Sequence, residues 1–146
     1  MSQHGDAIAS MTARRKARKR ALDVLYEADL RGTPVPGTLA SYVDRLAVPR
    51  PEHLGYAVTL VEGVHEHIGR IDELLSRYAE GWTLDRMPIV DRNLARVAVF
   101  ELIYCDDIDA PVAISEAVEL AKALSTDDSP RFLNGLLGRI AEFARP

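Results

Sequence analysis

The sequence lacks the features on which a disulfide-stabilised or membrane-spanning protein depends. It has one cysteine, Cys105, among 146 residues, which excludes an internal disulfide and fits a reducing cytoplasm. The longest nearly apolar run, residues 97–105, contains Glu101 and is too short to span a bilayer. A secretory signal needs an apolar stretch behind its basic residues. Here acidic residues interrupt that segment, which argues against a secretory signal. We therefore expect a cytoplasmic protein without membrane contact.

Motifs for catalysis, cofactor binding and metal binding are also missing. The chain contains no phosphate-binding loop, dinucleotide fingerprint, zinc-protease helix or serine-hydrolase elbow. His65 and His67 are two residues apart, so on a helix they would project about 200° apart and could not share a metal ion. His4 and His53 have no second ligand at a suitable spacing. The sequence predicts no metal, no cofactor and no enzymatic activity.

What the chain does have is positive charge concentrated near its start. Residues 14–20, the basic run, hold six of the eighteen Lys and Arg residues, while the net charge of the chain is −4, so the remainder sums to −10. A local positive stretch on an acidic body predicts a polyanionic partner, with nucleic acid as the first candidate. At a helix N-terminus these cations would oppose the helix dipole, a cost that a bound partner would offset.

Apolar residues recur at helical spacing along most of the chain, and no sustained strand alternation is present. Residues 91–104 are apolar on nearly all sides and predict a central buried helix. The predicted fold is all-α, a single compact bundle of six or seven helices over residues 12–146 behind a disordered leader of residues 1–11. The expected helices cover residues 12–30 with Thr12 as N-cap, 38–46, 52–79 with a split near Gly69, 91–104, 112–124 and 130–144.

A helical wheel divides the first of these helices into a packing face and a basic face. The packing face spans about 100° and comprises Ala17, Ala21, Val24, Leu25 and Ala28. Arg15, Lys19 and Tyr26 share one stripe on the other side. Cations beside an aromatic ring suit single-stranded nucleic acid, because the cations pair with phosphates and the ring stacks on an unpaired base. Such stacking stabilises the complex by about 1–3 kcal/mol per base. The alternative is a solvated helix end with Tyr26 packed on a neighbour.

The last expected helix carries a second candidate aromatic residue. Its core face comprises Leu133, Leu136, Leu137, Ile140 and Ala144. Phe132 lies at the rim of that face, where it either packs or offers another stacking platform. Asp127 and Asp128 precede Pro130, where a carboxylate favours the helix N-terminus and one of the two is a candidate cap.

Several segments in this order resemble the NusB family of bacterial transcription factors. They comprise Ala13–Arg18, Ala21–Tyr26, Trp82, Asp91–Arg96, Phe100–Leu102, Pro111–Lys122 and Asp127–Gly135. The resemblance implies an all-α RNA-binding fold and a role in transcription antitermination. It implies that the protein pairs with NusE, a small-subunit ribosomal protein. Together the two would bind the boxA element of nascent RNA, especially in ribosomal RNA operons, within the transcription elongation complex.

The resemblance also implies site residues, and the wheel adds Lys19 to them. The expected RNA contacts are Arg14, Arg15, Lys16, Arg18, Lys19, Tyr26, Asp128 and Phe132. A partner surface is expected near Asp91 and Arg96. A homodimer that covers the basic helix is compatible with the sequence, although no residue pattern predicts it.

The sequence leaves two alternative functions. A helical protein-interaction module would dock the basic helix on an acidic protein without RNA contact. An RNA methyltransferase is disfavoured: the fold resembles the N-terminal domain of certain ribosomal RNA methyltransferases, but the expected glycine-rich cofactor domain is missing from these 146 residues.

Overall fold

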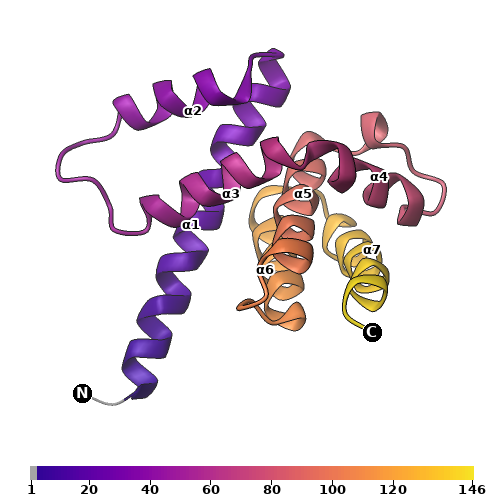
Figure 1. Ribbon diagram of the computed structural model, residues 1–146. Coiled ribbons are helices and arrows are strands. Elements are labelled where there is room, and N and C mark those ends of the chain that lie inside the picture. The colour runs from indigo at the N-terminus through magenta and orange to yellow at the C-terminus, as the bar shows by residue number, and fades with distance from the viewer. Residues whose placement is uncertain (1–2) are drawn as a thin grey trace. The chain divides into compact units, whose positions relative to one another are not determined.

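The computed structural model describes residues 3–146, with side chains from Met11 onward. Over that range the chain forms seven α-helices, one short 3₁₀ helix and no strand (Figure 1). The prediction of an all-α fold with six or seven helices is confirmed. The elements are α1 (Gln3–Arg31), α2 (Val35–Asp44), α3 (Leu54–Glu66), α4 (Ile68–Tyr78), η1 (Leu84–Arg86), α5 (Ile89–Tyr104), α6 (Ala110–Leu124) and α7 (Ser129–Ala144).

Helix α1 begins earlier than the sequence predicted. It begins at Gln3 and not after Thr12, so the basic run lies inside the helix and not at its N-terminus. The helix dipole acts on charges in the first and last turns, and the cost predicted for the run therefore does not apply. Residues 1 and 2 of the predicted leader lie outside the described residues. Residues 3–11 of the predicted disordered leader lie in α1, which corrects that part of the prediction.

Helix boundaries elsewhere follow the expected breaks closely. The long periodic stretch of residues 52–79 divides at His67, two residues before the expected break at Gly69. Pro88 is the N-cap residue of α5, while Pro111 and Pro130 lie in the first turns of α6 and α7. Proline is tolerated there because the first helical N–H groups have no intrahelical acceptor.

The chain divides into two compact units. The first ends at Glu62 and holds α1, α2 and most of α3, and the second runs from Gly63 to Pro146. The prediction of a single domain over residues 12–146 stays a prediction. The five residues predicted for the packing face of α1 are all buried. Arg18 and Leu22 are buried as well, so the packed face spans about 160° of the wheel and is wider than predicted.

In the second unit α5 is the central helix, as predicted. It packs against α4, α6 and α7, and Figure 1 shows α5, α6 and α7 side by side. Ten of its sixteen residues are buried. The core face of α7 is confirmed in Leu133, Leu136, Leu137 and Ile140, all 0% exposed. None of the helices in the described range has the length and apolar character needed to cross a membrane.

Candidate nucleic-acid interface

Two members of the basic run lie against an aromatic ring. The guanidinium carbon of Arg14 is 5.1 Å from the centroid of the Tyr56 ring, and that of Arg18 is 6.0 Å from it. Both distances are typical of a cation–π contact, which here joins α1 to α3. Arg18 is only 3% exposed. This burial argues against the predicted role of Arg18 as a phosphate contact.

A third cation, Arg20, is held by hydrogen bonds from α1 to other parts of the first unit. Its Nε donates to Nε2 of His53 at 2.7 Å, and its Nη1 lies 3.0 Å from the Tyr42 hydroxyl oxygen, to which it donates. Burial lowers the pKa of His53, and the positive charges of Arg20 and Lys16 lower it further. The lowered pKa favours the neutral imidazole, which is the form that accepts a hydrogen bond from Arg20.

The remaining cations of the run face solvent. Arg15 and Lys16 are exposed. The side chain of Lys19 is 42% exposed and forms an ion pair of 2.6 Å with Asp23, one turn along α1. Tyr26 is 37% exposed. The stripe predicted from the wheel, with Arg15, Lys19 and Tyr26, therefore lies on the accessible side of the helix.

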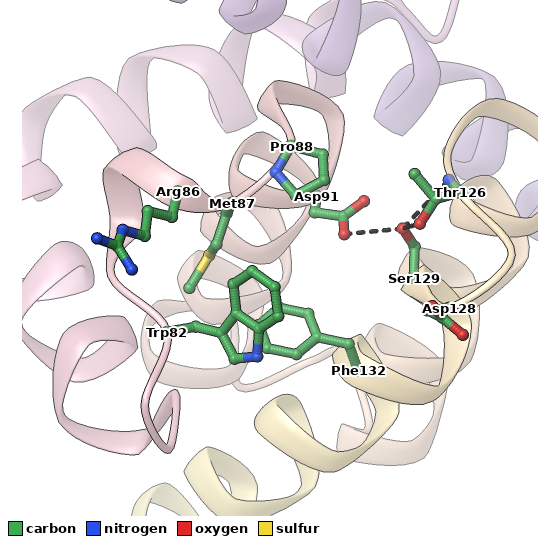
Figure 2. A pocket seen from close by; sticks show the side chains of 9 residues that line it. All are labelled: Trp82, Arg86, Met87, Pro88, Asp91, Thr126, Asp128, Ser129 and Phe132. Atoms are coloured by element: carbon green, nitrogen blue, oxygen red, sulfur yellow. Dashed lines mark hydrogen bonds between the residues drawn. The ribbon is translucent and has the colours of Figure 1, made fainter.

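The second unit contains a pocket of about 430 Å³ near the beginning of α7, which we call the α7 pocket (Figure 2). Its residues come from the connection between α4 and α5, from the start of α5 and from the start of α7. Two predicted RNA contacts, Asp128 and Phe132, line it, and so does Asp91, which was predicted for partner binding. The ring of Phe132 is half-buried, while Asp128 is exposed.

Trp82 also lines the α7 pocket, and sequence reasoning did not predict it as a contact. It lies between α4 and α5 and is 52% exposed. Its ring meets the ring of Phe132 edge to face, with centroids 6.0 Å apart and an interplanar angle of 63°. The available signal was a lone tryptophan in a stretch without helical periodicity, because a large aromatic residue outside the core often marks a contact surface.

A network of hydroxyl groups fixes the loop before α7. The carboxylate of Asp91, only 3% exposed, accepts hydrogen bonds from the hydroxyls of Ser125 and Ser129. The Ser129 hydroxyl oxygen accepts from the backbone N–H of Thr126 at 3.2 Å. Asp128 occupies the N-cap position of α7 without a side-chain hydrogen bond to the helix, which corrects the predicted capping role. Its carboxylate therefore stays exposed at the pocket.

The other residue predicted for partner binding, Arg96, makes contacts inside the second unit. Its Nε and Nη2 donate to the two carboxylate oxygens of Asp72 at 2.9 and 3.0 Å. This bidentate pair joins α5 to α4. Both Asp91 and Arg96 thus hold neighbouring elements in place, and a direct role of either residue in partner binding stays a prediction.

Among the described residues, no group of three or more His, Cys, Asp or Glu side chains is arranged to hold a metal ion. Cys105 is half-buried at the end of α5. The accessible side of α1 and the α7 pocket together offer cations, aromatic rings and the carboxylate of Asp128, which suits the recognition of phosphates and bases.

Comparison with known proteins identifies a family. Residues 15–142 match the family described as the NusB family. The chain is 75% identical over 134 residues to the transcription antitermination protein NusB of Salinispora tropica, covering 92% of this chain and 98% of that protein. It is 58% identical over 132 residues to the same protein of Kineococcus radiotolerans, covering 90% and 95%.

Solved structures agree with the sequence match. NusB of T. maritima superposes with a TM-score of 0.81 at 35% identity, covering 91% of this chain and 93% of that one. A chain in a structure of the antitermination factors NusB and NusE in complex with dsRNA gives a TM-score of 0.81 at 29% identity, covering 91% and 98%.

Proposed function

This chain belongs to the NusB family, and we propose that it is a transcription antitermination factor that binds the boxA element of nascent RNA together with NusE. The observation that carries the proposal is 75% identity to an antitermination protein across 92% of the chain. The protein would work in the cytoplasm, as part of the transcription elongation complex, as an adaptor and not as an enzyme. Ribosomal RNA operons, where the resemblance places boxA, are its expected targets.

In the first unit the exposed cations of α1 supply affinity. Arg15, Lys16 and Lys19 face solvent and would neutralise phosphates, which releases counterions and makes binding depend on salt. The exposed ring of Tyr26 would stack on an unpaired base. Arg14 and Arg18 would contribute indirectly, since their contacts with Tyr56 hold α1 against α3.

In the second unit the α7 pocket supplies selectivity. Aromatic rings bind the faces of bases, which are free only where a strand is unpaired. The exposed carboxylate of Asp128 accepts hydrogen bonds and would select a base edge that carries an amino group. A solved relative is in complex with dsRNA. For this chain the rings and the carboxylate favour an unpaired segment over a duplex.

The proposed protein partner is NusE, because a similar chain is found with NusE in a solved complex. Asp91 and Arg96 would shape the partner surface and not touch it directly. Asp91 fixes the loop before α7, and Arg96 fixes α4 against α5. A partner that docks near the start of α5 would then depend on these residues through the elements they hold.

The test is a binding titration with a short, labelled, single-stranded boxA-type RNA, with and without NusE. We expect fluorescence anisotropy to show saturable binding that NusE strengthens, and weaker binding of a scrambled RNA of equal length. If NusE binds while RNA does not bind under either condition, the chain is a protein-interaction module and the proposal is wrong.

A matched pair of variants locates the base contact. Phe132→Leu removes a ring from the α7 pocket. Phe143→Leu removes a ring from the same helix outside the pocket, where Phe143 is 46% exposed and contacts Tyr78 at a centroid distance of 6.0 Å. We expect the first variant to weaken RNA binding and the second to leave it unchanged. Equal effects would contradict the assignment of the pocket.

A further inference from the structure

We propose that Trp82 is the solvent-facing stacking platform of the α7 pocket, on which an unpaired RNA base lies while Phe132 supports the indole. The inference rests on the proposed RNA-binding function and adds a contact residue to it. Trp82 is 52% exposed, although an indole is among the largest apolar groups that a protein can bury. Exposed aromatic surface of this kind, rimmed by polar residues, marks a contact site.

The contact between the two rings leaves no room for a base between them. A base held between two rings needs about 7 Å from ring to ring, twice the carbon contact distance of about 3.5 Å. The centroids of Trp82 and Phe132 are only 6.0 Å apart, and the rings are inclined at 63°. Phe132 is half-buried and already in contact with the indole. The ring surface that remains for a base is therefore mainly that of Trp82.

The polar groups of the pocket would orient a nucleotide on this platform. Figure 2 shows Arg86 and Asp128 on opposite sides of the pocket, with the two rings between them. A guanidinium attracts a phosphate, whereas a carboxylate repels it and accepts a hydrogen bond from an amino group. A stacked nucleotide would thus place its phosphate toward Arg86 and its base edge toward Asp128.

The segment that carries Trp82 is anchored to the same helix as Phe132. Arg139 of α7 donates from Nε and Nη2 to the backbone oxygen of Tyr78, at 3.1 and 2.8 Å. Its Nε also lies 3.5 Å from a carboxylate oxygen of Glu80. The backbone N–H of Trp82 donates to the oxygen of Ala79 at 3.3 Å. The platform is thus positioned before RNA arrives, which reduces the ordering cost of binding.

The chain offers a direct readout, because Trp82 is its only tryptophan. The experiment titrates the 146-residue protein with a single-stranded boxA-type RNA and follows tryptophan emission. Labelled-RNA anisotropy is measured in parallel. We expect emission to be quenched with the same midpoint as the anisotropy change, because a stacked base alters the environment of the indole.

Two substitutions separate stacking from packing. Trp82→Leu keeps apolar bulk without a ring and should weaken binding by about 5- to 100-fold, while Trp82→Phe keeps a ring and should retain most of the affinity. Tyr104→Leu is the control, an exposed aromatic residue outside the pocket. Circular dichroism checks that each variant is folded.

The outcomes distinguish this inference from the function on which it rests. If the RNA binds by anisotropy, but emission is unchanged and Trp82→Leu binds within twofold of the native protein, Trp82 is not the platform and the proposed function stands. If the native protein binds no RNA by either readout, with or without NusE, the proposed function and the inference are both wrong.

Discussion

Neighbouring cations in the basic run have different environments because successive side chains on a helix project about 100° apart. Arg18 falls on the packed face and is 3% exposed, whereas Lys16 falls on the open side. The long apolar stem of arginine allows such burial while its head contacts the Tyr56 ring. One run of charge in the sequence therefore divides into packing residues and surface residues.

This division predicts that one substitution affects RNA binding and another affects stability. Lys16→Ala should weaken RNA binding and reduce the magnitude of its salt slope by about 0.7, without changing stability. Arg18→Ala should lower the free energy of unfolding by about 1–3 kcal/mol, because it removes buried packing and a cation–π contact. Urea denaturation and RNA anisotropy measure the two effects. A stable Arg18→Ala variant with reduced RNA affinity would instead make Arg18 a direct contact.

A second prediction at this scale concerns pH. The pKa of His53 is lowered by burial and by the charges of Arg20 and Lys16, so the unfolded chain binds this proton more tightly than the folded chain. His53 therefore makes its full contribution to the free energy of unfolding above its ordinary pKa of about 6.5. This contribution is lost as the pH falls toward the pKa of His53 in the folded protein. The native protein should lose more Tm between about pH 7.5 and 5.5 than His53→Gln, whose amide oxygen accepts without titrating. Equal losses in thermal melts would contradict the assignment.

At the scale of elements, Gly63 at the start of the second unit lies close to the ring of Phe100 on α5, because glycine has no side chain. A methyl group at Gly63 would overlap the ring of Phe100, so only glycine allows this approach. Phe100 in turn stacks on Tyr104, at a centroid distance of 5.6 Å. At Gly138, inside α7, no atom beyond the neighbouring residues and the nearby helix backbone lies within 4 Å of the position of a Cβ, so nothing prevents a methyl group there.

The two glycines form a matched pair for a stability experiment. Gly63→Ala should destabilise the protein by about 1–3 kcal/mol, because the ring of Phe100 has to move within a close-packed core. Gly138→Ala should stabilise it by about 0.5–1 kcal/mol, because alanine loses less backbone entropy in a helix. Chemical denaturation of both variants measures the difference. Destabilisation of equal size at both positions would show that helix geometry and not the contact with Phe100 decides the effect.

At the scale of the whole molecule, charge is distributed unevenly along the chain. The net charge is −4 although the basic run alone carries six cations. Long-range repulsion by the acidic remainder would keep RNA away from most of the surface and leave the accessible cations as the place of approach. The number of phosphates neutralised is then limited by the accessible cations and not by the number in the run.

This limit predicts a moderate salt dependence of RNA binding. Three accessible cations of the basic run, Arg15, Lys16 and Lys19, together with Arg86 at the α7 pocket give a log–log slope of about −3 for a single strand. All six cations of the run together with Arg86 would give about −5. Anisotropy titrations over a range of potassium chloride concentrations measure the slope. A slope near −5 would mean that the packed arginines also reach the RNA. A flat profile would exclude a phosphate-based interaction altogether.

The sequence by itself determined the helical class, the approximate helix positions and the packing faces of α1 and α7. Periodicity carries this information because a helix repeats every 3.6 residues and because large apolar side chains must leave water. Proline positions marked the starts of α5, α6 and α7 for an equally local reason. The family also followed from the sequence, since ordered motifs along the chain are a property of the chain alone.

Only the tertiary structure decided which chemically similar residues face solvent and which hold the fold together. The burial of Arg18, the hydroxyl partners of Asp91 and the pairing of Arg96 with Asp72 all depend on residues far along the chain. The contact of Trp82 with Phe132 joins positions 50 residues apart in the same way. Local patterns specify the direction of a side chain on its own element, and the atoms that meet it there come from the packing of other elements.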